Sequence, residues 1–549
     1  MYELTRRQAL LAGGAFTLAS LSLPKFLSAQ AERVPGGPVG DIEAIAPDWP
    51  EMIELFRLLI PNWEKLGVTV KAQHATLNTV FALTAGEHNA PHLTAEGWGG
   101  APDRIDPDFF MTEFFNSRRL EKGGLNYGNY NSPEFDKLNN AQRQEMDPKK
   151  RVELIHQAQQ LLLEDRPGVS IYYRDYVNPY RKDRIKGVVP VLGNGVGLAY
   201  IPWTYYMAEP IGERDFVRVT TQYDIATLNP FATGEVVNAS FLRFMYAPLV
   251  MRGPDLEPTP WTAESWEVID STTVDVTLRE GLKFHDGEPV KVEDLKFTFD
   301  FIAKHQFASY ARFNEHVASV EIVGDRTARF KLKQPYAPFV PNILGYAFIA
   351  PKHIWEEVEK DTSLGSPADW PNDNPVGYGP YRYGIWKKEE YFQFDANPEW
   401  FMPPNFSSMY WLIVPNIDSQ IGMLEAGDSD IMAWSLTPSQ IKQLQANPNI
   451  GVGSAPSHAP REIRYNLALP PFDDVVFRKA FAISIDREQL VNTLVDGAAT
   501  LGDDTFLSTE LPESDPSLTI PEFDIDKARA MLEEAGYTWD DDGRLHYPA

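Results

Sequence analysis

Apolar residues recur along the chain at spacings that alternate between those of helices and those of strands. Over residues 51–66 they lie three or four positions apart, which predicts a helix, and the apolar run at 68–70 predicts a buried strand after it. A helix opened by Pro148 and a strand over 169–173 repeat this order, which indicates an α/β protein. The apolar positions of the first helix are Met52, Leu55, Phe56, Leu59, Trp63 and Leu66.

From about residue 214 the pattern changes to short strands and hairpins. Residues 217–219 and 273–278 alternate as strands do, and His285-Asp286-Gly287 supplies a tight turn. Residues 524–548 then have the pattern of a helix followed by half a hairpin, with no partner element after them. These last elements therefore require a partner from elsewhere in the chain.

The charge balance narrows the choice of partners. The chain has 50 lysine and arginine residues against 77 aspartate and glutamate residues, a net charge of −27. Such a field repels phosphate backbones and anionic lipid, so we expect no nucleic acid and no membrane surface as a partner, and we expect a monomer. At 549 residues, of which 43% are hydrophobic, the chain is expected to fold into two or three packed units.

The first residues have the form of an export signal. Arg6-Arg7 precede the apolar run 9–23, and Ala29-Gln30-Ala31 supplies the small residues of a cleavage site. We expect a signal of the twin-arginine kind over 1–31, cleaved after Ala31, and a periplasmic protein. Because Ala9 stands where that pattern usually has a bulky apolar residue, Sec export is the alternative.

Two further features of the sequence bear on membrane attachment and on cross-links within the chain. No later apolar run approaches the roughly 18 residues of a spanning helix, so no stable membrane insertion is expected. The chain has no cysteine, which excludes disulfides, thiolate metal sites and the cysteine that carries a lipid anchor in many extracellular binding proteins.

Three short motifs look like chemical sites, and each has a better structural interpretation. Ser439–Lys442 has the spacing of serine acylating enzymes, but Thr437–Gln440 is a capping box with proline at the first helical position. His88 and His92 lie four apart, but a proline between them disfavours the helix that would place both on one face. Gly193–Gly197 lacks the ending of a phosphate-binding loop. We expect no catalytic residue, no metal site and no cofactor.

The strongest binding candidate is Gly97-Trp98-Gly99-Gly100. An indole between glycines can face a cleft and offer an apolar surface and an N–H group, while glycine lets the backbone approach a ligand closely. By residue type alone, a tryptophan is more often a core residue that ends a strand. Both interpretations of Trp98 stay open at this point.

Several stretches together resemble the extracellular solute-binding proteins, family 5, that serve oligopeptide, dipeptide and nickel ABC importers. Each stretch is weak alone, but together they cover nearly the whole chain after the predicted signal. The stretches are Thr227–Pro230, Pro260–Trp266, Leu282–Gly287, Glu293–Thr298, Asn374–Tyr381, Pro471–Ala480, Ser484–Arg487, Gly97–Gly99, Asp106–Asp108 and Tyr180–Lys182.

The resemblance implies an α/β, two-lobed fold of the type II periplasmic-binding-protein class, with a hinge between the lobes. The order of the stretches departs from the family, because material that comes first there is found here after residue 214. The chain therefore resembles a circularly permuted member, in which the unpaired elements at 524–548 would meet the strand near 39–46 and the helix 51–66. The predicted segments are 38–167 and 459–549 for lobe II, and 168–213 and 214–458 for lobe I.

The resemblance also implies a function and a set of residues. It implies the substrate-binding component of an ABC importer, which captures a small organic solute between its lobes and delivers it to an inner-membrane permease with ATPase subunits. A periplasmic sensory module is the alternative, and a hydrolase on the same fold is a third hypothesis. The residues expected to line the cleft are Gly97, Trp98, Gly99, Gly100, Asp103, Asn229, Phe231, Tyr246, Trp434, Tyr465 and Asn466.

One departure from the family bears on the ligand. In the peptide-binding members, an aspartate three residues after the tryptophan pairs with the amino terminus of the peptide. Here that position is Ala101, and the nearest carboxylate is Asp103. Unless Asp103 takes over this contact, the cleft suits an uncharged polar ligand such as a sugar, so a non-peptide ligand is expected.

Overall fold

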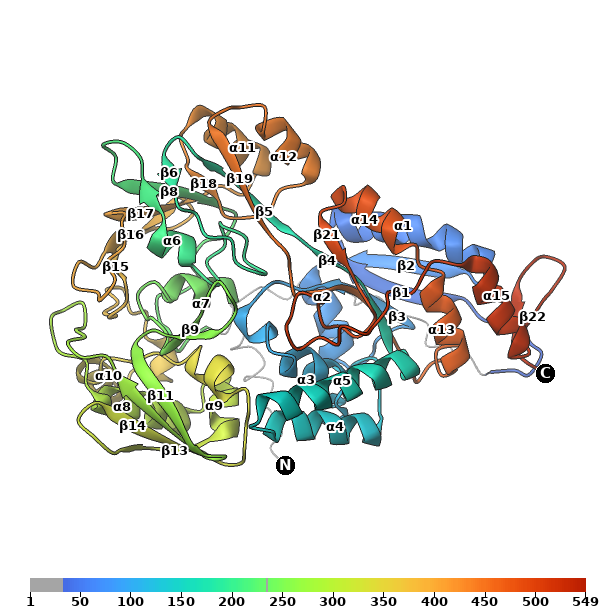
Figure 1. The fold of residues 1–549 in the computed structure, drawn as a ribbon, viewed down its shortest axis with the longest axis horizontal. Coiled ribbons are helices and arrows are strands. Elements are labelled where there is room, and N and C mark those ends of the chain that lie inside the picture. Colours follow the sequence, from blue (N-terminus) through green and yellow to red (C-terminus); the bar gives the residue numbers. More distant parts are fainter. Residues whose placement is uncertain (1–32, 234–235) are drawn as a thin grey trace.

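The computed structural model describes residues 33–233 and 236–549, and its strands form two large sheets, each at the centre of one lobe (Figure 1). The predicted export signal over 1–31 lies outside these residues. Across the described ranges, no helix is both long and apolar enough to cross a bilayer. The expected α/β class and two-lobed architecture are confirmed.

Lobe II is built on a six-stranded sheet of order β2-β1-β3-β20-β4-β21. Strand β1 is parallel to β2 and β3, and β20 runs antiparallel between β3 and β4. Trp63 stacks on Phe481 with ring centroids 4.8 Å apart in a core that the lobe's helices cover. The elements are β1 (Ile42–Pro47), α1 (Pro50–Lys65), β2 (Val70–Ala75), β3 (Leu93–Gly97), β4 (Gly168–Arg174), β20 (Arg461–Tyr465), α13 (Val475–Ile483), α14 (Arg487–Val495), β21 (Ala499–Leu501) and α15 (Ile525–Glu534).

A second apolar cluster in lobe II lies under three helices, the first two of which contact the other lobe. These are α3 (Asp108–Phe115), α4 (Pro133–Gln144) and α5 (Pro148–Asp165). The helix α5 begins at a proline, as expected, and the side chain of Asp147 caps its first turn.

Lobe I contains a seven-stranded and a four-stranded sheet around one large aromatic core. The seven-stranded sheet has the order β15-β16-β17-β8-β18-β5-β19, and the four-stranded sheet has the order β11-β12-β14-β13. Its strands are β5 (Tyr176–Arg181), β8 (Phe216–Thr221), β11 (Ala263–Asp270), β12 (Thr273–Leu278), β13 (Val317–Ile322), β14 (Thr327–Leu332), β15 (Tyr381–Lys387), β16 (Tyr391–Ala396), β17 (Ser408–Ile413), β18 (Ile431–Met432) and β19 (Ile450–Ala455). Its helices include α7 (Val236–Leu242), α8 (Val292–His305), α9 (Ala311–His316) and α12 (Pro438–Leu444).

The chain passes between the two sheets at two places. Strand β4 belongs to lobe II and β5 to lobe I, so one crossing is at Asp175, and the other lies between β19 and β20 at 456–460. The first crossing is later than the boundary expected at residue 168. The reason is that the strand predicted there pairs with β20 and β21 in the lobe II sheet before the chain leaves it.

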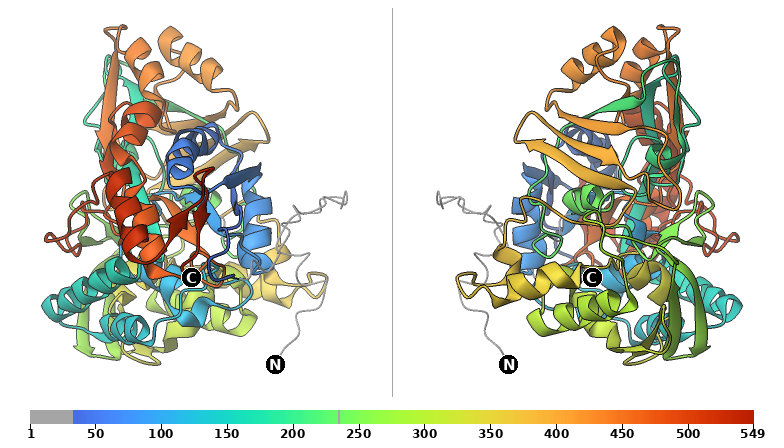
Figure 2. Two further views of the ribbon diagram at one scale, coloured as in Figure 1. Left: turned by 90° about the vertical axis from the view of Figure 1, so that its right-hand side faces the viewer. Right: turned by 90° about the vertical axis from the view of Figure 1, so that its left-hand side faces the viewer.

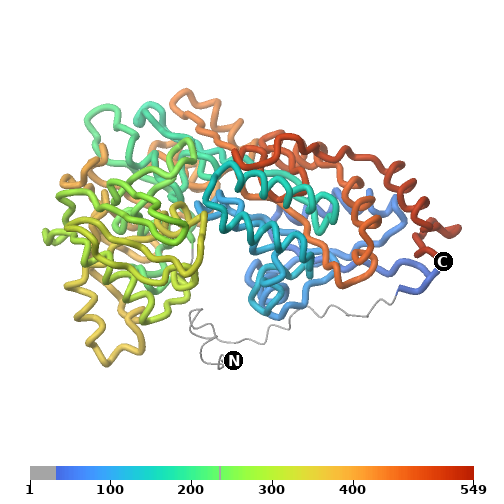
Figure 3. Tube along the Cα trace, turned by 60° about the horizontal axis from the view of Figure 1, so that its bottom comes forward, coloured from blue at the N-terminus to red at the C-terminus, as the bar shows by residue number. Residues whose placement is uncertain are grey.

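The two ends of the described chain lie side by side. The C-terminal hairpin of β22 (Thr538–Trp539) and β23 (Leu545–His546) packs against the first described residues, as Figures 2 and 3 show for the red and blue ends. The Val39 N–H donates to the Leu545 carbonyl at 2.8 Å, and the Tyr547 N–H donates to the Gly37 carbonyl at 2.9 Å. The C-terminal elements thus contact residues 36–39 and 65–67, beside the strand and helix expected for them, whereas β1 itself pairs with β2 and β3.

Candidate functional site

The loop after β3 carries one side of the site across to lobe I. Strand β3 ends at Gly97, and Arg104 Nη1 holds the following turn by donating to the Gly99 carbonyl at 2.7 Å. A Cβ atom on Gly100 would lie 1.9 Å from the carbonyl oxygen of Gly193 in lobe I. Only glycine permits this approach, so the loop and the Gly193 turn pack backbone against backbone.

Asp103 on this loop is bound by two side chains of lobe I. Its carboxylate accepts from Arg312 Nη2 at 2.7 Å and from Tyr346 Oη at 2.7 Å. Burial alone would raise the pKa of Asp103, but the charges of Arg312 and Arg104 and these hydrogen bonds lower it to about 2. Asp103 is therefore ionised at neutral pH and joins the two lobes.

A cavity of about 130 Å³ opens beside this ion pair, between the lobes. One guanidinium in its wall, that of Arg243, stacks over the Tyr346 ring at 4.2 Å and donates to the Tyr200 carbonyl at 3.2 Å. Arg243 makes no ion pair with any residue of 33–233 or 236–549. The lining residues are Asp103, Pro230, Thr233, Val236, Ala239, Leu242, Arg243, Tyr246, Ser309, Tyr310, Arg312, Phe313, Tyr346 and Phe348.

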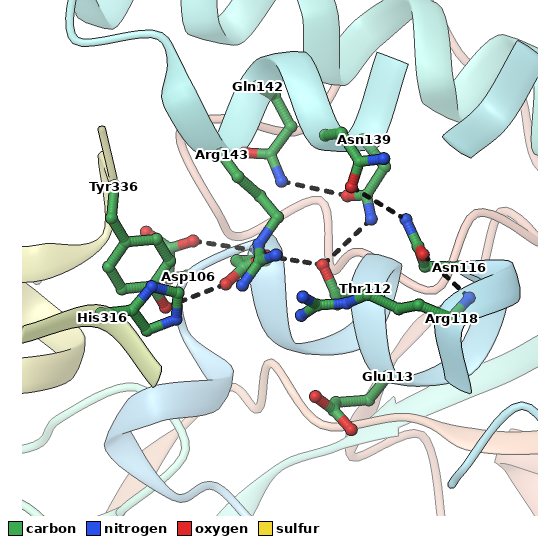
Figure 4. A network of polar contacts seen from close by, with 12 residues as sticks. Asp106, Thr112, Glu113, Asn116, Arg118, Asn139, Gln142, Arg143, His316 and Tyr336 are labelled. Atoms are coloured by element: carbon green, nitrogen blue, oxygen red, sulfur yellow. Dashed lines mark hydrogen bonds and ion pairs between the residues drawn. The ribbon is translucent and has the colours of Figure 1, made fainter. Parts of the chain in front are cut away.

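A polar network further along the interface also joins the lobes (Figure 4). The carboxylate of Asp108 in lobe II forms an ion pair with Arg143, 2.7 Å from its Nε, and accepts a hydrogen bond from Tyr336 Oη of lobe I at 3.0 Å. The Tyr336 ring stacks on His316 with centroids 3.6 Å apart, and burial lowers the pKa of His316 to about 4. Because these groups are buried and mutually paired, they hold the lobes together near the cavity.

Trp98 points into the core of lobe II. Its side chain contacts Phe81, Phe109, Phe110 and Phe114, and only 9% of the residue is exposed. The indole N–H donates to Glu462 Oε1 at 3.0 Å. Trp98 does not line the cavity beside Asp103, so its role in ligand binding stays a prediction.

The other predicted residues are divided between the lobes. Tyr246 lines the cavity with Asp103, whereas the side-chain amide of Asn229 donates to the Trp370 carbonyl at 2.8 Å in a buried turn. Phe231 packs among the rings of the lobe I core, and Trp434 packs against Tyr223 by a separate small cavity. Tyr465 and Asn466 lie in lobe II, where Tyr465 stacks on Phe472 and Asn466 bonds to Asn129 and the Ala90 carbonyl.

Sequence reasoning missed all the lining residues except Asp103 and Tyr246, among them Arg243, Arg312 and Tyr346. One signal was present, because Arg243 is the one charged residue between positions 236 and 251, in an otherwise apolar run. A cation in such a run is unusual unless it faces a polar cavity or a partner. Across the described ranges, no three His, Asp or Glu side chains lie close enough together to hold a metal ion.

Comparison with known families gives one match that covers more than half of the chain. The family of bacterial extracellular solute-binding proteins, family 5, matches residues 257–548. Among curated proteins, the glutathione-binding protein GsiB of Salmonella typhi is 28% identical over 335 residues, which are 58% of this chain and 61% of GsiB. The oligopeptide-binding protein AppA of Bacillus subtilis is 29% identical over 282 residues, which are 50% of this chain and 51% of AppA. The chain therefore spans about three fifths of the length of the curated relatives it matches first.

Solved structures give weaker matches to the same kind of protein. AppA of Bacillus subtilis in complex with a nonapeptide has a TM-score of 0.46 at 23% identity, covering 60% of this chain and 66% of that chain. The periplasmic oligopeptide-binding protein of Thermotoga maritima has a TM-score of 0.49 at 23% identity, covering 60% and 65%.

Proposed function

This chain belongs to the bacterial extracellular solute-binding proteins of family 5, and on that premise we propose that it is the substrate-binding component of an ABC importer. It captures a small organic solute between its lobes and delivers it to an inner-membrane permease with ATPase subunits. Binding rather than catalysis is the activity proposed.

The observation that carries this proposal is a cavity of lobe I whose wall Asp103 of lobe II completes. Asp103 reaches it from lobe II, while Tyr246, Arg312 and Tyr346 reach it from lobe I. A solute held there contacts both lobes at once, so its binding favours the arrangement in which they touch. The two crossings at Asp175 and at 456–460 are the segments about which the lobes turn.

The place of action and the chain order are part of the same proposal. The protein is exported by a twin-arginine signal cleaved after Ala31, and it acts as a periplasmic monomer. Its segment order is a circular permutation of the family's order. The contact of Gly36 with Pro548, at 3.0 Å between backbone nitrogen and oxygen, supports this because the rearrangement needs adjacent ends.

The test is mass spectrometry of small molecules that the purified periplasmic protein retains, with small-angle scattering before and after they are removed. We expect one retained solute, and an increase in the radius of gyration when it is gone. A protein that retains nothing and gains nothing from a periplasmic extract would contradict solute binding. A radius of gyration that does not change would contradict hinge closure.

A further inference from the structure

We propose that the solute carries an anionic group that Arg243 binds, and that it needs no free amino group. This inference rests on the proposed function and names the chemical class of its ligand. It follows from four features of the cavity beside Asp103, namely its charges, the free donors of Arg243, the pairing of Asp103 and its apolar wall.

The charged groups do not balance among the described residues that line the cavity. Arg243 and Arg312 supply two positive charges, and Asp103 supplies one negative charge. The tyrosines of the wall are neutral at physiological pH, since burial raises the pKa of Tyr346 to about 12 and raises those of Tyr246 and Tyr310 further. The described part of the cavity wall is thus positive by one charge inside a protein whose net charge is −27.

Arg243 supplies the excess charge and has donors to spare. A guanidinium has five N–H donors, and among the described residues Arg243 donates to one acceptor, the Tyr200 carbonyl. Its position over the Tyr346 ring fixes its plane, with Arg312 over the same ring at 5.2 Å. Arg243 is half-buried and has no counter-ion within 33–233 and 236–549, and a ligand anion in the cavity supplies one through a charge-assisted pair.

Asp103 is not free to bind an amino group. Its two carboxylate oxygens are taken by Arg312 and Tyr346, and its backbone N–H donates to Tyr346 Oη at 3.0 Å. An ammonium group would have to displace Arg312 from this half-buried pair and leave its guanidinium without a partner, which is unfavourable. The cavity therefore selects an anion over an amino terminus.

The rest of the wall suits an apolar body attached to that anion. Leu242, Phe313 and Phe348 face the cavity beside the two arginines, as do Pro230 and Val236. A carboxylate on an apolar skeleton satisfies both surfaces, whereas a sugar leaves Arg243 without a counter-ion. A phosphate monoester has the same anionic chemistry as a carboxylate, so the experiment separates the two.

The experiment compares the full mature protein with Arg243→Gln and Arg279→Gln. Arg279 is a matched control because it also lies over an aromatic ring, that of Phe401 at 4.1 Å, and donates to carbonyl groups outside the cavity. Mass spectrometry identifies the solute that each protein retains. Calorimetry then measures how tightly each protein binds four probes. These are 3-phenylpropionate, its neutral amide, phenyl phosphate and the dipeptide Phe-Ala.

We expect an anionic solute that the protein and Arg279→Gln retain and that Arg243→Gln loses. Among the probes, we expect at least one anion to bind about 10-fold more tightly than the amide, and Arg243→Gln to remove that difference. Whichever of the two anions binds more tightly shows whether the group is a carboxylate or a phosphate.

Three results would overturn the inference while leaving the proposed function in place. These are a retained solute that is neutral or cationic, an anion that Arg243→Gln retains as well as the parent protein does, and tighter binding of Phe-Ala than of either anion. A protein that retains no solute and binds no probe would instead count against solute binding itself.

Discussion

Two buried carboxylates share one arginine at the end of β3 and in β20. Arg464 lies 2.8 Å from Glu96 Oε2 and 3.0 Å from Glu462 Oε1, and all three side chains are almost fully buried. Burial raises the pKa of Glu96 despite the charge of Arg464. Burial and the charge of Glu96 together raise the pKa of Glu462 well above its usual range. The trio therefore favours a state in which the two carboxyl groups hold one proton.

This arrangement predicts how stability depends on pH. A carboxyl group whose pKa is raised by folding stabilises the protein fully below its unfolded pKa, and this contribution is lost as the pH rises through the folded pKa. We expect Glu462→Gln to raise the free energy of unfolding at alkaline pH and to reduce the fall of this free energy as the pH rises above the usual glutamate pKa of 4.5. Urea unfolding at several pH values measures this. Exposed Glu267→Gln is the control, and equal slopes in both variants would contradict the prediction.

Substitutions of Trp98 can show whether it is a core residue or also contacts the ligand. Because its ring packs against Phe114 at 5.0 Å and its N–H is bonded to Glu462, we expect Trp98→Ala to lower the free energy of unfolding by about 3–5 kcal/mol. Trp98→Phe keeps most of the ring and should recover part of this loss. Calorimetry of the retained solute on Trp98→Phe then tests the ligand contact. Unchanged affinity would leave Trp98 a core residue only.

At the scale of single residues, sequence reasoning named two side chains of the cavity and missed its arginines. Asp103 came from its position near Trp98, and Tyr246 came from the family resemblance. Arg312 meets Asp103 across 209 positions of the chain, and Tyr346 meets it across 243. Contacts over such separations leave no periodic pattern in the sequence, so only the folded chain reveals them.

Single elements were predicted more closely because their signals are local. The helix expected over 51–66 is α1, Pro50–Lys65, and the capping box expected at 437–440 is present, with Gln440 N–H donating to Thr437 Oγ1. The strand expected over 169–173 is β4, but its apolar pattern fits either lobe equally well. Which sheet it joins depends on β20, nearly 300 residues later, and this is why the crossing was placed too early.

Because the loop at Gly100 contacts the turn at Gly193, we expect a single methyl group added at Gly100 to change both stability and solute binding. Gly100→Ala would drive its Cβ to within 1.9 Å of a carbonyl oxygen, so the loop must move away from lobe I. We expect a loss of about 1–3 kcal/mol in stability and weaker binding of the retained solute, since Asp103 lies on the same loop. Thermal unfolding and calorimetry measure the two effects.

Gly422 in α11 (Ile417–Ala426) is the matched control, because a Cβ there meets nothing within 4 Å. Gly422→Ala is expected to leave binding unchanged and to stabilise the helix by about 0.4–1 kcal/mol. If Gly100→Ala behaved in the same way as this control, the close approach of the two loops would not exist in solution.

At the scale of the whole molecule, each lobe has its own buried core, and the segments of each core come from both halves of the chain. The core of lobe II combines residues near 40–70 with residues near 463–547. A core assembled from both halves depends on contacts in space and not on the order in which its segments are linked. The physical condition for a changed order is that the ends to be joined lie together and that the new break is exposed.

Both conditions are met, so we expect a rearranged chain to fold. In this variant residues 214–549 come first and residues 33–212 follow. They are joined where the Gly36 N–H already donates to the Pro548 carbonyl and the Tyr547 N–H to the Gly37 carbonyl. The new break falls at Gly212, which is exposed and meets no atom within 4 Å of a Cβ position. We expect its free energy of unfolding to stay within about 1 kcal/mol of the parent chain and its retained solute to be the same.

A second rearranged chain, opened inside β4 between Ile171 and Tyr172, should fail to fold because the break removes a central strand that pairs with both β20 and β21. Failure of the first chain under conditions where the parent folds would show that the present order is required, and that this protein is not simply a relinked form of its family's fold.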